Sequence, residues 1–170
     1  MGYFDNPWFY FAHSETVKAT SSEYILISMN FRVPKNVHFE CQRCARCCGD
    51  TSHRGRNILL LETEVDRISK NTGMRPSSFS SPASSNGQYH HKMKKRSGRC
   101  VFLDGKSCRI YNIRPIICQF YPFSMKKTNG AYVFDVAADC AGVGLGEPIT
   151  KEYYERMAKK ATKSLETEDS

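Results

Sequence analysis

Four cysteines lie within eight residues of this chain, in the pattern Cys-x2-Cys-x2-Cys-Cys at positions 41–48. A Cys-x2-Cys spacing lets two sulfur atoms reach one metal ion while nearby backbone amides donate hydrogen bonds to the sulfurs. On an ideal helix Cys41, Cys44 and Cys48 would lie within about 60° of one another, with Cys47 about 60° further round. We therefore expect three thiols to converge, in a helix or in a loop, and Cys47 and Cys48 to point in different directions. Free thiols this close together oxidise readily, so the pattern predicts a metal site.

The geometry of one hairpin turn decides how the next two cysteines lie. The dipeptide Asp104-Gly105 marks that turn, between Cys100 and Cys108. If Gly105 takes the left-handed position of a three-residue loop, the two cysteines lie directly opposite each other, and this is the arrangement we expect. A two-residue turn would place the two thiols on opposite faces of the ribbon.

A second hairpin concerns the last two cysteines. An Asn-Gly dipeptide at 129–130 predicts a two-residue turn, which pairs position 128 with position 131. Counted back along both strands, this register pairs Gln119 with Cys140, so Cys118 and Cys140 are expected at the same end of the ribbon. The eight thiols then form one tetrad and two cross-strand pairs, enough for two four-ligand sites.

The spacing of the cysteines also bears on which metal is bound, because thiolates suit both zinc and iron. Zinc ribbons usually pair two Cys-x2-Cys knuckles, whereas the second half of this chain offers Cys-x7-Cys and two isolated cysteines. Cys-x2-Cys-x2-Cys is the spacing of three iron ligands in bacterial ferredoxins. We therefore expect a [4Fe-4S] cluster ahead of Zn²⁺, with redox disulfides third. The first predicted ligands are Cys41, Cys44 and Cys48, followed by Cys47 and by the pairs Cys100/Cys108 and Cys118/Cys140.

The formal net charge is +8 and the pI about 9.1, which permits attraction to nucleic acid. That charge counts every thiol as neutral, and two filled metal sites of about −2 each would lower it to about +4. The most basic stretch, 90–99, has five Lys or Arg but no neighbouring stacking aromatic apart from Tyr89. We expect this stretch to be a solvated loop. We also expect the protein to bind a protein or redox partner rather than nucleic acid.

The length and the ends of the chain indicate a single cytoplasmic domain. A chain of 170 residues fits one domain, and no apolar run approaches the roughly 18 residues of a membrane span. The N-terminus lacks the basic flank and apolar stretch of a signal peptide. With no secretory signal, clustered thiols are more often metal ligands or redox groups than disulfide bridges.

The predicted fold is α+β, a small domain of short helices and β-hairpins with irregular loops stapled by metal. Alternating apolar residues predict one strand over 25–33 that ends at Pro34. A short helix is expected over 61–71, and an amphipathic helix over 150–165. Six serines at 77–87 predict a loop or insertion.

We expect three parts along the chain. They are an aromatic-rich arm and strand at 1–38, a cysteine-cluster metal-binding domain at 39–146 with a Ser-rich insertion at 77–87, and a C-terminal amphipathic helix at 147–170. The six aromatic residues between positions 3 and 11 are expected to fold over the domain's own core.

Three segments carry a resemblance to a known family. CQRCARCC at 41–48, GRCVFLDGKSCRIYNIRPIICQFYPF at 98–123 and DCAGVGLG at 139–146 resemble the CxxCxxCC cysteine-cluster family, also called the YkgJ-like family of zinc- or iron-chelating domains. The resemblance runs from about Phe39 to Gly146 and includes all eight cysteines in order. It implies a small cytoplasmic metal-binding protein, commonly an iron–sulfur protein with a structural or electron-transfer role. One branch resembles flagellin lysine N-methylases, so the resemblance also implies an enzymatic alternative, a protein-lysine methyltransferase that uses S-adenosylmethionine.

Within the resembling region, Arg109 and Arg114 are candidate cofactor-binding residues. Their guanidinium groups would neutralise an anionic thiolate site or bind a substrate carboxylate. The structural alternative is that they brace the extended backbone that Pro115 and Pro122 impose. Gln119 departs from the family pattern, which has Arg at this position.

Overall fold

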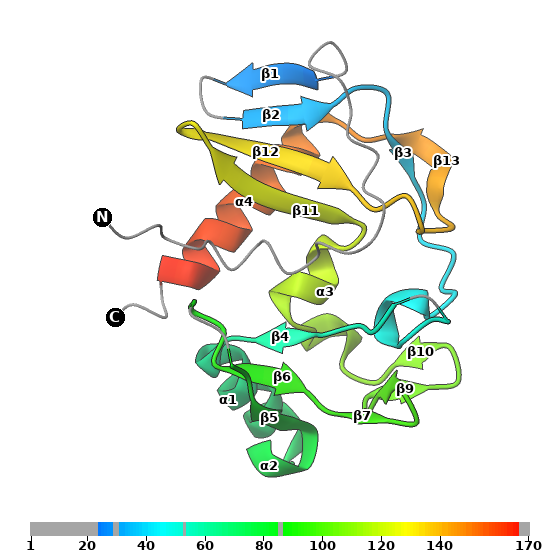
Figure 1. The fold of residues 1–170 in the computed structure, drawn as a ribbon, viewed down its shortest axis with the longest axis vertical. Helices are drawn as coiled ribbons and strands as arrows, with labels where there is room; N and C mark the ends of the chain where they lie inside the picture. Colours follow the sequence, from blue (N-terminus) through cyan, green and yellow to red (C-terminus); the bar gives the residue numbers. More distant parts are fainter. Residues whose placement is uncertain (1–23, 29–30, 53, 85–86, 167–170) are drawn as a thin grey trace. The chain divides into compact units, whose positions relative to one another are not determined.

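The computed structural model describes four stretches of the chain (Figure 1). They are residues 24–28, 31–52, 54–84 and 87–166. The predicted aromatic arm at 3–11 therefore lies outside the described residues.

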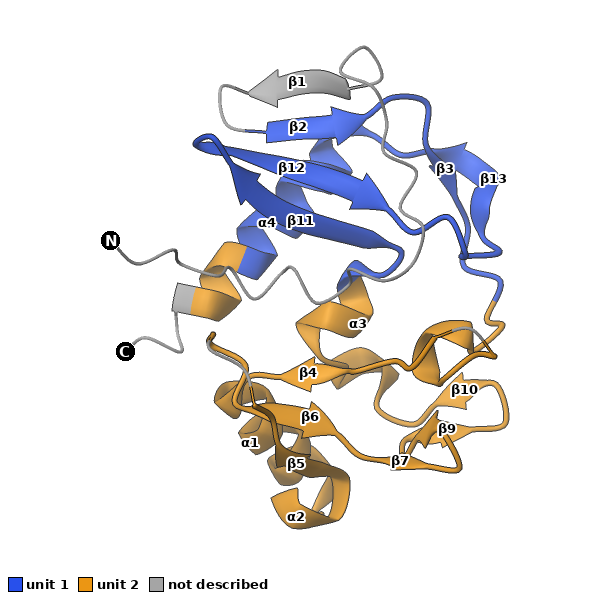
Figure 2. Ribbon diagram, in the orientation of Figure 1, with its two compact units in different colours: residues 1–42, 120–161 blue, residues 43–119, 162–170 orange. Residues whose placement is uncertain are grey.

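The chain forms two compact units (Figure 2). Unit 1 comprises residues 1–42 and 120–161, and unit 2 comprises 43–119 and 162–170. Each unit combines helical segments with small sheets, so the predicted α+β class is confirmed. Within the described stretches, no helix is both long and apolar enough to cross a membrane.

Unit 1 is built on a four-stranded sheet in the order β1-β2-β12-β11. Its strands are β1 (Tyr24–Ser28), β2 (Phe31–Pro34), β11 (Phe123–Thr128) and β12 (Ala131–Val136). The prediction of one strand over 25–33 is wrong, because β1 and β2 form an antiparallel hairpin in which Ile25 pairs with Val33. Period-two alternation identifies extended chain but does not mark where the chain reverses. The predicted end at Pro34 is confirmed.

The hairpin of β11 and β12 has the predicted turn but a shorter ladder. Thr128 pairs with Ala131, and both turn residues between them have left-handed φ angles of 50° and 78°, as a type I′ turn requires. The strand pairing ends at Phe123 and Val136. The predicted pairing of Gln119 with Cys140 is therefore wrong. Proline 122 offers no N–H to continue the ladder, and Gln119 lies in a helix, α3 (Ile116–Phe120).

Aromatic rings fill the core of unit 1. The ring of Phe134 lies 5.1 Å from that of Tyr154 and 6.2 Å from that of Phe120, and Phe123 lies 5.5 Å from Tyr154, all between centroids. Tyr154 belongs to α4 (Lys151–Glu166), which confirms the amphipathic helix predicted over 150–165. Burying each such side chain stabilises the folded state by roughly 1.5–3 kcal/mol. A two-stranded ribbon of β3 (His38–Phe39) and β13 (Val143–Pro148) completes the unit.

Unit 2 contains a three-stranded sheet in the order β4-β6-β5, together with short helices. Its strands are β4 (Leu59–Leu60), β5 (Ser80–Pro82) and β6 (His91–Met93). Helix α1 (Glu62–Thr72) matches the predicted helix within one residue and ends at Gly73, whose φ of 69° allows the left-handed C-cap. Val65 and Ile68 of α1 are buried, so its apolar stripe faces the core.

Two segments predicted as loops have regular structure in unit 2. Residues 77–87 contribute most of α2 (Pro76–Phe79) and all of β5, and the side chain of Phe79 is completely buried. The basic stretch 90–99 contributes to β6, β7 (Lys95–Arg96) and β8 (Arg99–Cys100). The loop predictions are wrong at these elements, because a buried apolar residue, Phe79 or Met93, anchors each segment among polar neighbours. The solvation predicted for 90–99 is confirmed, since Lys92, Lys94, Arg96 and Arg99 are exposed.

The rest of unit 2 consists of very short elements that carry the cysteines. They are the 3₁₀ turn η3 (Arg46–Cys48), β9 (Leu103–Asp104), β10 (Ser107–Cys108), the 3₁₀ turn η4 (Tyr111–Ile113) and α3.

Candidate metal centre

The first cysteine segment is an irregular loop that ends in a 3₁₀ turn. Ala45, with a left-handed φ of 60°, precedes η3, and its carbonyl accepts a hydrogen bond from the N–H of Cys48 at 3.0 Å. Of the two backbone alternatives, the loop is the one adopted. The sulfur atoms of Cys47 and Cys48 lie 3.7 Å apart. The prediction that these neighbours point in different directions is wrong, because it assumed the regular dihedral angles of a helix or strand.

Cys100 and Cys108 come together by a route other than the predicted loop. The turn between β9 and β10 has two residues, with Gly105 at a left-handed φ of 54°, and Cys108 pairs with Leu103. The predicted direct pairing of the two cysteines is wrong, since Cys100 pairs with Lys95 of β7 instead. Burial raises the pKa of the Cys100 thiol, and the thiol of Cys108 raises it further, so the two groups are electrostatic neighbours.

The thiol of Cys118 interacts electrostatically with other thiols of unit 2. Cys118 as a whole residue is half-buried. Burial of its thiol raises the pKa of that thiol well above the ordinary value. Three further thiols raise this pKa, those of Cys100, Cys47 and Cys108. A hydrogen bond with Cys48, together with burial, raises the pKa of Cys47 in turn. We call these five residues the thiol cluster: Cys47, Cys48, Cys100, Cys108 and Cys118.

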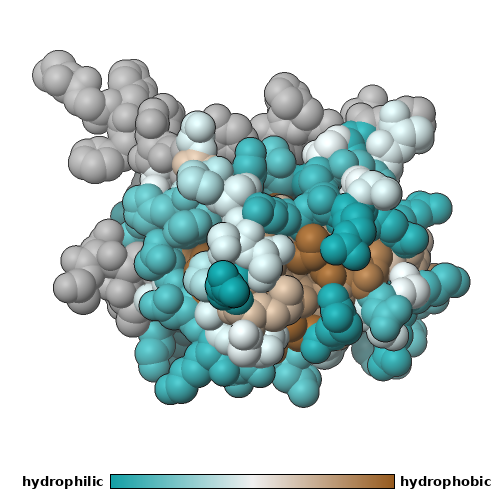
Figure 3. All heavy atoms as spheres, turned by 90° about the horizontal axis from the view of Figure 1, so that it is seen from below, coloured by the Kyte–Doolittle hydropathy of each residue, from teal (hydrophilic) through white to brown (hydrophobic). Residues whose placement is uncertain are grey.

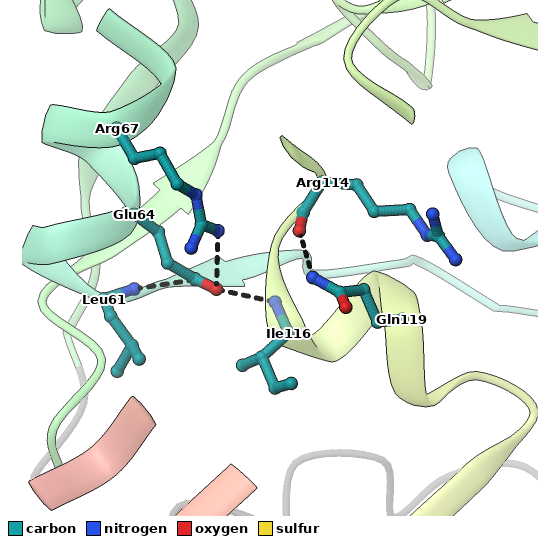
Figure 4. A network of polar contacts seen from close by, with 6 residues as sticks. All are labelled: Leu61, Glu64, Arg67, Arg114, Ile116 and Gln119. Atoms are coloured by element: carbon teal, nitrogen blue, oxygen red, sulfur yellow. Dashed lines mark hydrogen bonds and ion pairs between the residues drawn. The ribbon is translucent and has the colours of Figure 1, made fainter. Parts of the chain in front are cut away.

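A buried carboxylate fixes the helix that carries Cys118 (Figure 4). Glu64 of α1 is 2% exposed, and its carboxylate accepts hydrogen bonds from the N–H groups of Leu61 at 3.2 Å and Ile116 at 2.6 Å. The first bond closes the capping box of α1, and the second satisfies the first N–H of α3. The guanidinium of Arg67 lies 3.5 Å from the same carboxylate. Glu64 therefore ties the two helix starts together and holds Cys118 in place.

A buried arginine lies beside Cys47. Asp50 accepts hydrogen bonds from the backbone N–H of Arg56 and from Lys95, each at 2.6 Å, and so folds the loop after Cys48 back on itself. Arg56 is 5% exposed, and its positive charge lowers the pKa of the Cys47 thiol against the larger effects of Cys48 and burial. Sequence reasoning missed both Arg56 and Glu64. Glu64 had a signal, its place three residues after the helix N-cap, whereas nothing in the sequence marks Arg56 as buried.

The two predicted cofactor-binding arginines lie in different surroundings. Arg109 donates a hydrogen bond to the carbonyl of Val101 at 2.8 Å, and its charge lowers the pKa of Cys100. The guanidinium of Arg114 stacks 3.9 Å from the ring centroid of Tyr111, while its carbonyl accepts a hydrogen bond from Gln119 at 2.7 Å. Arg109 is thus beside the thiol cluster, and Arg114 has the bracing contacts of the structural alternative.

The remaining cysteines lie elsewhere. Cys44 belongs to unit 2 and is exposed, whereas Cys41 and Cys140 belong to unit 1. Those two lie near one end of the β3–β13 ribbon, because the N–H of Glu40 donates to the carbonyl of Gly142 at 3.0 Å. A Cβ atom at Gly142 would collide with the Glu40 carbonyl, so only glycine permits this close approach.

The thiol cluster fits a metal by its donor chemistry. In the described part of the chain, no group of three or more Cys, His, Asp or Glu is arranged so that it would hold a metal ion. The pKa of Cys47 is raised by its hydrogen bond with Cys48 and by burial, and the pKa values of Cys100 and Cys118 are raised by burial. The thiolates of these three residues therefore need further stabilisation. A cation supplies that stabilisation, because a coordinating thiol loses its proton. Metal binding here would draw the sulfurs together.

Comparisons with known proteins agree with this donor set. A family model, CxxCxxCC, described as "Putative zinc- or iron-chelating domain", matches residues 40–141. An uncharacterized protein of Methanocaldococcus jannaschii is 28% identical over 143 residues, which cover 78% of this chain and 73% of that protein. No solved structure matches the chain.

Proposed function

The chain belongs to the CxxCxxCC family of zinc- or iron-chelating domains, and on this premise we propose that its thiol cluster holds a [4Fe-4S] cluster. The observation that supports the proposal is that the thiols of Cys100, Cys47 and Cys108, from other segments of unit 2, raise the pKa of the Cys118 thiol. Four thiolates are what such a cluster requires. Cys41, Cys44 and Cys140 remain predicted ligands.

The surroundings of the thiol cluster support an anionic centre. Arg56 and Arg109 bring positive charge to Cys47 and Cys100 respectively, which offsets the charge of thiolate ligands. Glu64 fixes α3 through the Ile116 N–H, so Cys118 is oriented by a neighbouring helix rather than by the metal alone. A bound iron–sulfur cluster supplies one-electron transfer or a structural cross-link.

The test is the metal content of anaerobically purified protein. Iron, zinc and acid-labile sulfide are measured together with the visible absorption spectrum. We expect about four iron and four sulfide per chain and a brown absorption band. Protein that purifies without metal and keeps full native stability would contradict any metal centre.

One observation favours zinc as the second candidate. Two thiolates on one tetrahedral zinc, each about 2.3 Å from the ion, lie about 3.8 Å apart. The sulfurs of Cys47 and Cys48 are 3.7 Å apart, so these two residues already have the spacing of ligands that share an ion. Colourless protein with one or two zinc ions per chain would establish this candidate in place of the first.

A further inference from the structure

The positive charge of the protein belongs almost wholly to unit 2. Unit 2 contains 16 Lys or Arg and 8 Asp or Glu, a net charge of +8. Unit 1 contains 9 Lys or Arg and 9 Asp or Glu, so its net charge is zero. A charge concentrated on one part of a protein steers partners of opposite charge to that part.

Arginines border the cysteine segments of unit 2. Arg46 directly precedes Cys47, Arg99 precedes Cys100, and Arg109 follows Cys108. A fourth arginine, Arg96, pairs with Arg99 across β7 and β8. All four side chains are exposed. We call them the arginine rim: Arg46, Arg96, Arg99 and Arg109.

The backbone holds two of these arginines in an unfavourable arrangement. Arg96 and Arg99 face each other across a two-residue turn, in which Ser97 and Gly98 have left-handed φ angles of 49° and 74°. Like charges directly opposite each other on paired strands destabilise the fold. Gly49, next to Cys48, forms a β-bridge with Arg99, so this pair borders the thiol cluster.

The acidic groups nearby do not neutralise the pair. Among the described residues, the side chains of Arg96 and Arg99 form no hydrogen bond or ion pair, whereas their neighbour Lys95 is paired with Asp50 at 2.6 Å. The four arginines of the rim carry +4, and a four-thiolate metal centre carries about −2. The rim therefore stays positive when the metal is bound.

We propose that the arginine rim docks a carboxylate-rich surface of a partner protein against the metal centre. Guanidinium groups bind carboxylates through two parallel hydrogen bonds, which gives orientation as well as attraction. Contact between the Arg96–Arg99 turn and the partner brings the partner next to Gly49 and hence to Cys48. A centre that exchanges electrons, or that is loaded by another protein, needs such close approach.

Nucleic acid fits the same surface less well. Single strands bind through several stacked aromatic rings, and the one large exposed aromatic among the described residues of unit 2 is Tyr111. Its ring is already occupied by Arg114. Helix α1, the longest helix contained in unit 2, mixes Glu62, Asp66 and Lys70 on its exposed side, so it has no basic face for a groove. The face of the molecule drawn in Figure 3 carries mostly hydrophilic side chains around a smaller apolar area.

The docking proposal rests on the proposed function, because that function supplies the metal centre. The experiment below tests peptide binding and metal content separately. Binding of a short fluorescent poly-glutamate peptide and of single-stranded DNA of equal charge is measured by anisotropy, on full-length protein of known metal content. The test variant is R96Q/R99Q. The control variant K70Q/R75Q removes the same charge from exposed positions in the same unit.

We expect the wild type to bind the peptide more tightly than the DNA. R96Q/R99Q should weaken peptide binding about tenfold, and K70Q/R75Q less than about twofold. R96Q/R99Q should keep or raise the melting temperature, since it removes a repulsion. Equal losses in both variants, tighter binding of DNA, or no peptide binding by metal-loaded protein would overturn the docking proposal. Protein that lacks metal but still binds the peptide would overturn the proposed function alone.

Discussion

The two units differ in how the chain is held. In unit 1, β11 and β12 share six consecutive residue pairs, and four aromatic rings form three contacts with centroids 5.1–6.2 Å apart; they belong to Phe120, Phe123, Phe134 and Tyr154. In the cysteine-bearing part of unit 2, β7 to β10 have two residues each and form two separate two-stranded ribbons, β7–β8 and β9–β10, with one further bridge between Arg99 and Gly49. Strands this short are marginal without other support. Unit 1 is thus held by apolar burial along a long ladder, whereas in the thiol segments of unit 2 the proposed metal would supply support that the short strands do not.

Metal removal should produce the largest difference between the two units. We expect a chelator under reducing conditions to remove amide hydrogen-exchange protection from residues 95–118, because metal binding is coupled to folding. The β11–β12 ladder should keep its protection. Equal loss in both units, or no loss in either, would contradict a metal-stapled segment; the measurement is exchange resolved by mass spectrometry.

The reverse perturbation is Phe134→Ala. This ring is completely buried, and its removal should cost about 3–5 kcal/mol of unfolding free energy in urea. The metal content per folded chain should stay unchanged, since Phe134 belongs to unit 1 and the thiol cluster to unit 2. Metal lost in proportion to stability would show that the two units fold as one.

Glu64→Gln should have a smaller effect on the unfolding free energy, and it should also weaken metal binding. A neutral amide cannot accept both backbone hydrogen bonds as strongly, so we expect a loss of about 1–3 kcal/mol and a weaker hold on α3. Metal affinity, measured by competition with a chelator, should fall as well. Glu62→Gln is the control, because Glu62 lies on the exposed side of the same helix, where its carboxylate is 2.7 Å from the ring of His91. Equal effects from both changes would remove the positioning role of Glu64.

The smallest effect concerns a surface ion pair. A double-mutant cycle of Asp50→Asn and Lys95→Gln should give a coupling of about 0.2–1 kcal/mol. The matching cycle on Lys126 and Asp135 of unit 1 should give a similar value. A coupling well above this range at Asp50 alone would show that the pair also braces the loop of Arg56 beside Cys47.

The sequence predicted the elements whose signals are local. Helix α1 has a glycine C-cap and an apolar stripe, α4 has a long amphipathic period, and the Asn-Gly turn fixes its own register. The errors arose where a prediction needed information from a distance. Counting a register back past Pro122 assumed a strand where the chain forms α3, and the turn at Gly105 was assigned one residue too many.

For the candidate site, residue identity was predictable but arrangement was not. All the members of the thiol cluster were predicted as metal ligands, yet the grouping of Cys118 with Cys47 depends on how α3 is held by Glu64. The burial of Arg56 depends on a turn closed by Asp50. Both are tertiary contacts between segments, and no periodicity or spacing within one segment encodes them.

The thiol cluster has a consequence for the order of events during synthesis. Cys47 and Cys118 are 71 residues apart, so at about 5–20 residues per second the ribosome needs about 4–14 s to supply the last thiol after the first. For that interval Cys47 and Cys48 exist as adjacent reduced thiols without their later partners. A chain released before Cys118 would keep the oxidisable pair and lack the last member of the thiol cluster. If the thiol cluster holds the proposed metal, its loading is a late event, and the nascent chain has to stay reduced until α3 has emerged.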